Sequence, residues 1–495
     1  MNLAMDWRKE AGKLSFRDKA FIGGRFVPAA SGATYDCISP VDGKLLAKIA
    51  AGDREDVDRA VKAARAAFNS GTWADQPPKS RKRTLLKLAE LIAAHADELA
   101  LLETLDMGKP IKFAKNVDIN AVVECVRWYA EAIDKIYDEI APTATDSLAL
   151  VTREPLGVGG AGVPWNFPLL MAAWKFAPAL AMGNSVIVKP AEQSPLSVLR
   201  VAELAAEAGI PEGVFNVVPG FGETAGQALG RHMEVDAVAF TGSTEVGKLF
   251  LKYSGESNMK IVSLECGGKT PNIVFADAPD LEAAAAGAAE GIFFNSGQVC
   301  SAASRLLVEE KIHDAFVDKV KALAAVYQPG DPLDPKTLMG SMVDRAQMDR
   351  VLGYIEKGKQ EGAALAAGGR QVRQNSGGFY IEPTVFDRVT GAMTIAREEI
   401  FGPVLSTLTF RNAEEAVKIA NDTIYGLSGS LWTNDLKRGL RVAQAIKTGV
   451  LSVNSSSSVH LQGPFGGYRQ SGLGRELGMH ALEHYSELRN IYFET

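Results

Sequence analysis

The strongest constraint on the fold is an alternation of helical segments with short β-branched runs. Apolar residues recur with helical spacing over 55–70, 80–106 and 118–140, whereas 185–188 and 261–264 are short runs rich in valine and isoleucine. Alternation of these two patterns predicts the strands of a parallel sheet joined by helices that cover its faces. We therefore expect an α/β fold.

This alternation runs through the chain twice. A first series predicts a strand at 185–188, a helix at 195–208 and a strand at 214–218, which is a βαβ unit typical of nucleotide-binding sheets. A chain of 495 residues also exceeds what one hydrophobic core usually holds. The second series follows Gly267-Gly268, with strands and helices at 271–275, 279–294, 304–308 and 311–325. We therefore expect two α/β domains with an active site in the cleft between them.

The charge balance gives no reason to expect a polyanionic partner. With 53 basic and 59 acidic residues the net charge is −6, so neither nucleic acid nor an anionic membrane surface is expected to bind. The N-terminal segment lacks the apolar core of a signal peptide, and the apolar run at 281–294 is too short to span a bilayer. The four cysteines lack CxxC spacing, so we expect a cytoplasmic protein with no disulfide framework and no metal.

Two residues point to covalent catalysis. Cys300 ends the segment 294–300, and Glu265 lies upstream in the segment 264–269; each segment contains glycine. A thiol and a carboxylate in such settings suggest a nucleophile with a separate general base. The alternative is that Cys300 is a small buried packing residue.

Two glycine segments compete as the dinucleotide site. The segment 157–162 satisfies the GxGxxG pattern, but Pro164 and Pro168 would interrupt the helix that this motif requires. Gly242 and Ser243 instead end a predicted strand and begin a predicted helix, whose N-terminal N–H groups can bind a phosphate. We favour the second segment.

Five further motifs stand in one order along the chain. Together with the segments of Glu265 and Cys300, they resemble the NAD(P)-dependent aldehyde dehydrogenase superfamily of the hydrolytic type, from about Phe21 to Phe493. The five motifs occupy 163–170, 189–192, 240–247, 398–403 and 464–467.

The resemblance implies an aldehyde dehydrogenase-like fold with two parallel-sheet α/β domains and a small β oligomerisation arm. The segment 146–158 alternates like an exposed strand pair and 488–493 like a terminal strand, which leaves two edges free to pair between subunits. A homodimer or homotetramer is therefore expected. The expected limits are 1–137 and 159–267 for the NAD-binding domain, 138–158 and 484–495 for the arm, and 268–483 for the catalytic domain.

The resemblance also implies oxidation of an aldehyde to its carboxylic acid through a cysteine thiohemiacetal and a thioester. Cys300 would attack the carbonyl, Asn166 and the Cys300 backbone N–H would stabilise the oxyanion, and Glu265 would activate water. Lys175 would act electrostatically or as a proton relay, and Glu476 would line a water channel. As alternatives, Asn166 is a buried amide that ties down a loop, and Glu476 is an exposed ion-pair partner.

The implied cofactor is NAD, with NADP used less well. Lys189 and Glu192 match family residues that hydrogen-bond the adenosine ribose, and a carboxylate there would repel a 2′-phosphate. The alternative for these two residues is a surface ion pair. The cofactor-binding residues that the resemblance implies are Trp165, Lys189, Glu192, Gly242, Ser243, Glu399 and Phe401.

The identity of the aldehyde is less constrained. The segments 101–110 and 130–135 resemble bacterial γ-glutamyl-aminobutyraldehyde and broad-substrate aldehyde dehydrogenases, whereas the serine-rich loop 455–461 does not. An apolar tunnel would favour medium-chain or aromatic aldehydes, unless Asp118 or Glu124 reaches its entrance and attracts an aminoaldehyde. The expected tunnel residues are Phe167, Met171, Trp174, Val299 and Ser301.

Two other functions fit parts of this pattern. A CoA-acylating aldehyde dehydrogenase would share the fold and the thiol but would not need Glu265, and a structural protein on the same scaffold would need neither residue. Cys266 stands where the family usually has leucine or alanine. It is either a packing residue or a thiol able to pair with Cys300.

Overall fold

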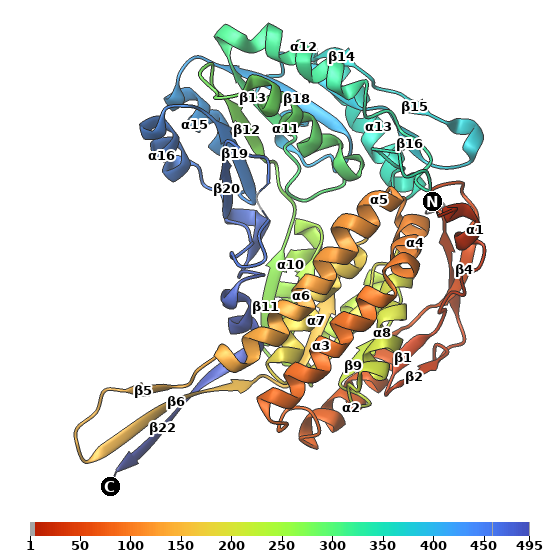
Figure 1. Cartoon of the computed structure of the whole chain (residues 1–495), viewed down its shortest axis with the longest axis vertical. Coiled ribbons are helices and arrows are strands. Elements are labelled where there is room, and N and C mark those ends of the chain that lie inside the picture. The colour runs from red at the N-terminus through yellow and green to blue at the C-terminus, as the bar shows by residue number, and fades with distance from the viewer. Residues whose placement is uncertain (1–4, 458, 495) are drawn as a thin grey trace.

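The computed structural model describes residues 5–457 and 459–494, so the chain ends of the expected first domain and arm, and Ser458 of the loop 455–461, lie outside the described residues. Two sheet-containing bodies lie one above the other in Figure 1, and a narrow β arm extends from the lower one. The expected fold class, with two α/β domains and an arm, is confirmed.

The lower body is built on an eight-stranded sheet whose five central strands are parallel. Helices pack on both faces, and each face buries its own set of apolar side chains. In sheet order the strands are β2 (Arg25–Val27), β1 (Ala20–Ile22), β9 (Phe215–Val217), β8 (Ser185–Lys189), β7 (Val158–Gly162), β10 (Ala237–Thr241), β11 (Ile261–Glu265) and β21 (Gly472–Leu473). One face carries α2 (Arg54–Asn69) and α10 (Thr244–Gly255), and the other carries α3 (Pro78–Ala94), α4 (Ala96–Met107), α6 (Asn120–Ala132), α7 (Pro168–Ala181) and α8 (Leu196–Ala208).

The upper body contains a seven-stranded sheet that is parallel except at one edge. Its strands are β14 (Ala364–Ala367), β17 (Thr384–Asp387), β18 (Val404–Phe410), β13 (Arg305–Glu309), β12 (Pro271–Val274), β19 (Ser428–Trp432) and β20 (Val450–Val453). Helices α11 (Leu281–Phe293) and α12 (His313–Ala324) cover one face, and α13 (Arg345–Gln360), α15 (Ala413–Asn421) and α16 (Leu436–Ala445) cover the other.

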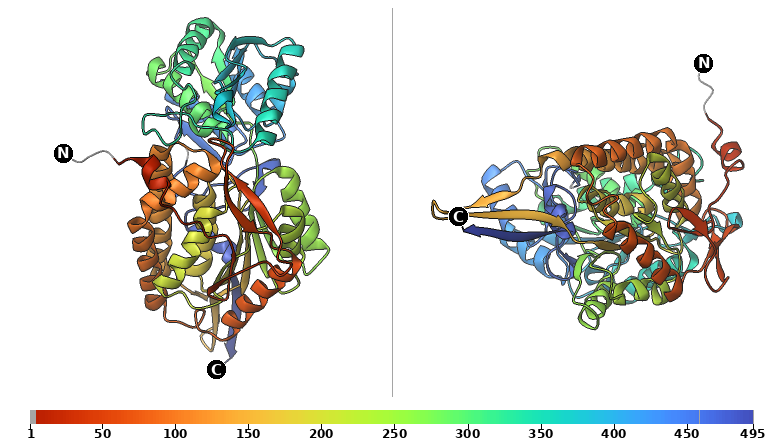
Figure 2. Two further views of the ribbon diagram at one scale, coloured as in Figure 1. Left: turned by 90° about the vertical axis from the view of Figure 1, so that its right-hand side faces the viewer. Right: turned by 90° about the horizontal axis from the view of Figure 1, so that it is seen from below.

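The arm is a three-stranded antiparallel sheet in the order β22 (Ser486–Glu494), β6 (Ser147–Pro155), β5 (Glu139–Ala141). β22 pairs with β6 along its whole length, from Ser486 opposite Pro155 to Glu494 opposite Ser147. Figure 2 shows the arm projecting well clear of the two bodies. Most of β22 is exposed, whereas most of β6, the central strand, is half-buried.

The structure corrects three local expectations. The helix expected at 80–106 is broken at His95, which ends α3 and precedes α4. The helix expected at 118–140 begins as a π-helical segment, η1 (Ala114–Ile119), and continues in α6 only to Ala132. The expected strand pair at 146–158 is wrong, because β6 is a single strand that pairs with β5 and β22.

The domain limits given above stay a prediction. One strand crosses between the two bodies: β21 lies in the segment expected for the catalytic domain, yet it pairs with β11 in the lower sheet. Among the described residues, no helix has the length and apolar character needed to cross a bilayer.

Candidate active site

Cys300 and Glu265 meet in a cavity of about 180 Å³ between the two bodies. Glu265 is the last residue of β11, at the carboxyl end of the lower sheet, and Cys300 lies in the loop that precedes β13 of the upper sheet. The predicted site residues that line this cavity are Trp165, Asn166, Met171, Trp174, Gly242, Ser243, Glu265, Cys300, Glu399, Phe401 and Glu476.

A strained loop holds Cys300 in place. Asn295, Ser296 and Gly297 are consecutive left-handed residues, with φ of 50°, 56° and 70°. Such backbone costs on the order of 1–3 kcal/mol for each non-glycine residue, and it persists only where the surroundings fix it. Ser296 Oγ donates to the Gly340 carbonyl at 3.1 Å, and the Gln298 amide nitrogen donates to the Ser341 carbonyl at 3.3 Å. The loop is therefore anchored on its far side by a neighbouring segment.

Asn166 joins this loop to the lower body. Its side-chain amide nitrogen donates to the Gln298 carbonyl at 2.9 Å, and the Asn295 amide nitrogen donates to the Asn166 carbonyl at 3.0 Å. Asn166 therefore does tie down a loop. A carboxamide has two N–H donors, however, and one such bond leaves the second free for a ligand at the cavity wall.

Glu265 is a buried carboxyl group whose two oxygens have no hydrogen-bond partner among the described residues. Burial and the nearby Glu476 raise the pKa of Glu265 well above its ordinary value, and Lys175 acts in the opposite direction. Buried polar groups are nearly always paired, so an unpaired one at a cavity wall is typical of a functional group.

Glu476 forms a buried ion pair with Lys175, at 2.6 Å, and the Lys175 ammonium also donates to Thr241 Oγ1 at 2.6 Å. Both residues are almost fully buried, so the alternative of an exposed ion pair for Glu476 is wrong. Lys175 does not line the cavity itself, but its two partners, Thr241 and Glu476, do. The pair brings a charged group from α7 next to the ends of β10 and β11.

The surroundings of the Cys300 thiol favour its protonated form. Burial, Glu265 and Glu399 together raise the pKa of Cys300 to about 12. A thiolate is the nucleophilic form, so the thiol has to lose its proton before it attacks a carbonyl. Cys266 also lines the cavity, and both thiols are free.

Four of the predicted cofactor residues, Lys189, Glu192, Gly242 and Ser243, lie at or just after the carboxyl ends of strands in the lower sheet. Lys189 ends β8, is mostly buried, and pairs with Glu192 at 3.2 Å. Ser243 caps α10 by accepting a hydrogen bond from the Val246 N–H at 3.3 Å. The competing segment 157–162 lies in and beside the buried strand β7, so it opens no helix.

Glu399 and Phe401 enter the cavity from the upper body. Glu399 accepts a hydrogen bond from the Gly268 N–H at 3.0 Å, and burial raises its pKa to about 7. The Phe401 ring meets the Trp165 ring edge-on at 5.2 Å. Phe401 thus contacts Trp165, another residue predicted to bind the cofactor.

Two lining residues were missed from the sequence. Gln347 on α13 donates to the Phe401 carbonyl at 2.8 Å, and Arg350, one turn later, donates to the Glu399 carbonyl at 3.3 Å. They fix the backbone that carries Glu399 and Phe401, the two residues predicted to bind the cofactor. They belong to no motif, and an exposed amphipathic helix gives no sequence signal of a nearby cavity.

The predicted tunnel residues are only partly brought together. Met171 and Trp174 on α7 line the cavity, and Phe465, another residue missed from the sequence, packs on Trp174 at 5.3 Å. Phe465 also lines an adjoining hollow of about 380 Å³ formed with the serine-rich loop. Phe167, Val299 and Ser301 are outside the cavity lining, and their role stays a prediction.

The burial of Asp118 rules it out as an acidic tunnel entrance, and such a role for Glu124 stays a prediction. Asp118 is fully buried in an ion pair with Lys109. Glu124 is exposed and pairs with Arg127 at 2.8 Å. Asp118 lies in the π-helical segment η1, which turns its side chain into the core.

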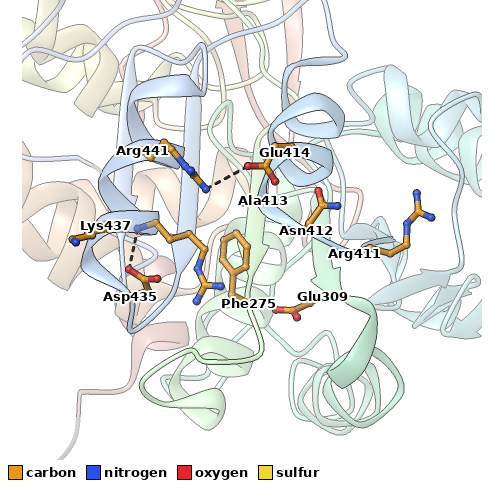
Figure 3. A pocket seen from close by; sticks show the side chains of 10 residues that line it. Phe275, Glu309, Arg411, Asn412, Ala413, Glu414, Asp435, Lys437 and Arg441 are labelled. Carbon is orange, nitrogen blue, oxygen red and sulfur yellow. Dashed lines mark hydrogen bonds and ion pairs between the residues drawn. The ribbon is translucent and has the colours of Figure 1, made fainter.

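A larger hollow, of about 490 Å³, lies at the carboxyl ends of the central strands of the upper sheet (Figure 3). Three arginines that line it form ion pairs: Arg441 with Glu414, Arg438 with Asp277, and Arg411 with Glu415. It holds neither the thiol nor the unpaired carboxyl group. We therefore take the smaller cavity as the functional site.

The chain is similar to known proteins over nearly its whole length. The model of the aldehyde dehydrogenase family matches residues 26–491. The chain is 51% identical to the NADP/NAD-dependent aldehyde dehydrogenase PuuC of Escherichia coli K12, over 98% of this chain and 97% of that protein. A solved structure of an indole-3-acetaldehyde dehydrogenase complexed with NAD+ superposes with a TM-score of 0.98 at 55% identity, covering 99% of both chains. A γ-glutamyl-γ-aminobutyraldehyde dehydrogenase of Burkholderia cenocepacia gives 0.97 at 53%, with the same coverage.

Proposed function

The chain belongs to the aldehyde dehydrogenase family, and we propose that it oxidises an aldehyde to the carboxylic acid with NAD, through a thioester on Cys300. The observation that carries this proposal is the unpaired, buried carboxyl group of Glu265 in the same cavity as the Cys300 thiol and the Asn166 amide. These are the three groups that the chemistry needs.

The first step is addition of the Cys300 sulfur to the aldehyde carbon, with the thiol proton passing to a base in the cavity. The spare N–H of Asn166 and the Cys300 backbone N–H stabilise the negative oxygen that forms. A bound NAD, held by Trp165, Glu399 and Phe401, would supply the acceptor for the hydride that this carbon loses. The carbon is then a thioester of Cys300.

Water completes the reaction. Glu265 takes a proton from a water molecule, whose oxygen attacks the thioester carbon and releases the carboxylic acid and the thiol. Glu265 suits this step because no protein group occupies its oxygens. The Lys175–Glu476 pair lies next to it and supplies a route for the proton to leave.

The residues present fit the cofactor. The carboxyl ends of β8 and β10, and the N-terminus of α10, lie along one edge of a parallel sheet, where dinucleotides bind in such folds. Lys189 and Glu192 would hold the adenosine ribose, and Ser243 with the α10 N-terminus would hold a phosphate. Trp165, Glu399 and Phe401 would hold the nicotinamide half beside Cys300.

Two alternatives fit the cavity less well. A CoA-acylating enzyme would transfer the acyl group from Cys300 to the thiol of CoA. It would therefore not need a carboxyl group at Glu265 to activate water. A binding protein would have no use for a strained loop that presents Cys300.

The arm leaves exposed apolar side chains such as Ile140, Leu488 and Tyr492, so we propose a homodimer or homotetramer in which the arm packs on a second subunit.

A panel of aldehydes tests the function. With NAD present, we expect NADH absorbance to appear with medium-chain and aromatic aldehydes, because Met171, Trp174 and Phe465 make the inner cavity apolar. Aminobutyraldehyde should be a poorer substrate, since Asp118 is buried and Glu124 is not among the residues that line the cavity. Initial rates give kcat/KM for each, and a best rate with the cationic aldehyde would contradict the apolar assignment.

The cofactor preference tests Glu192. We expect NAD to be preferred about 5- to 150-fold in kcat/KM, because the Glu192 carboxylate faces a 2′-phosphate of NADP while Lys189 offsets part of the repulsion. Glu192→Gln should narrow this ratio mainly by improving NADP. Glu207→Gln, an exposed acid on the helix that follows, is the matched control. Equal use of both cofactors by the unmodified enzyme would show that Glu192 turns away from the ribose.

A further inference from the structure

Three charged side chains lie fully buried beneath the loop that carries Asn166. Glu103 comes from α4, Lys109 follows that helix, and Asp118 comes from the π-helical segment η1. Each is at most 1% exposed. Lys109 and Asp118 form an ion pair. None of the three lines the cavity or takes part in the chemistry proposed above.

Two of these groups hold the loop on either side of Pro168. The Lys109 ammonium stands over the ring of Phe167, 3.7 Å from its centre. The Glu103 carboxylate accepts hydrogen bonds from the Leu169 N–H at 2.9 Å and from Ser197 Oγ at 3.1 Å. Phe167 and Leu169 are the first and third residues after Asn166.

The N-terminus of α7 depends on this contact. Its N-cap residue, Phe167, provides no side-chain hydrogen bond to the first turn, so the Leu169 N–H is satisfied by Glu103 from another helix. The first N–H groups of a helix have no partner within it, and a carboxylate is the best acceptor for them. Glu103 thereby fixes where α7 begins, and with it the direction in which the chain enters from Asn166.

Such a cluster is costly to bury. One Glu103 oxygen and one Asp118 oxygen have no hydrogen-bond partner among the described residues, and charges without full compensation destabilise a core. Apolar residues of similar size would fill this space at lower cost. The cluster contacts one short loop at two points, Phe167 and Leu169. We therefore explain it by the geometry that it imposes on that loop.

We propose that Glu103 and the Lys109–Asp118 pair are positioning residues that aim the Asn166 carboxamide at the substrate oxygen. This inference rests on the proposed function, in which Asn166 stabilises the oxyanion formed on Cys300. Lys109 acts through the Phe167 ring and Glu103 through the Leu169 N–H. They speed formation of the thioester and leave hydrolysis and NAD affinity unchanged.

A double-mutant cycle with Asn166 tests the proposal. In the otherwise unmodified enzyme, Glu103→Ala should slow the first NADH-forming turnover about tenfold, measured by stopped flow. The double variant Lys109→Met/Asp118→Asn, which removes both charges of the pair and so leaves the net charge of the cluster unchanged, should slow it by a similar factor. In an Asn166→Ala background, both changes should have less than about a twofold effect, because the group they position is gone.

Two further variants separate positioning from general stability. Glu103→Gln keeps an oxygen for the Leu169 N–H and should restore the rate to within about threefold. Glu98→Gln removes an acid of the same helix that pairs with Arg17 and Arg200, away from α7, and should leave the rate unchanged. Equal slowing in the presence and absence of Asn166 would overturn the proposal. If the unmodified enzyme forms no NADH with any aldehyde, it is the proposed function that fails.

Discussion

Cys300→Ala is expected to abolish aldehyde oxidation while leaving NAD binding nearly intact. The Cys300 thiol forms the covalent bond to substrate in the proposed reaction, so turnover should fall below about one thousandth of that of the unmodified enzyme. The residues proposed to hold NAD lie on the edge of the lower sheet and on the Glu399–Phe401 segment, and they are unchanged. NADH absorbance measures the first effect, and titration of protein fluorescence with NAD measures the second.

Cys266→Ala is the matched control for this change. Cys266 is also a free thiol that lines the cavity, but it follows Glu265 on the lower body and is not anchored by the strained loop. Its replacement should leave turnover within about twofold. Turnover of the Cys300 variant within tenfold of the unmodified enzyme would overturn the assignment of the nucleophile.

Glu265→Gln should separate the two halves of the reaction. The thioester still forms, because Cys300 and Asn166 are intact, so one equivalent of NADH per active site should appear in a rapid burst. Hydrolysis then lacks its base, and steady-state turnover should fall about 10²- to 10⁴-fold. Stopped-flow absorbance records both phases. Loss of the burst together with turnover would mean that Glu265 acts earlier, as the acceptor of the thiol proton.

Much of the site could be predicted because its residues lie where strands end. Glu265, Lys189 and Gly242 each follow a short apolar run that reads as a buried strand, and parallel strands bring their carboxyl ends to one edge. The segments around Asn166 and Cys300 were predicted to belong to the site because they resemble those of a known family. Their spacing alone left open a buried packing cysteine and a structural amide.

Features that depend on tertiary packing were not predicted. Asp118 has the sequence of an exposed helical acid, but the π-helical turn of η1 rotates it toward Lys109 in the core. Gln347 and Arg350 reach the cavity only because α13 packs across the Glu399–Phe401 segment. The return of β21 to the lower sheet is set by pairing with β11, which no local pattern encodes.

The covalent thioester on Cys300 is tested most directly by mass spectrometry of the Glu265→Gln enzyme, quenched in acid just after it is mixed with NAD and an aldehyde that gave a burst. The account predicts a mass increase equal to the acyl group, located by peptide mapping on the peptide that contains Cys300, and no such increase when NAD is omitted or when Cys300 is also replaced by alanine. An unmodified Cys300 peptide after a full burst of NADH, or an acyl group on Cys266 instead, would contradict it.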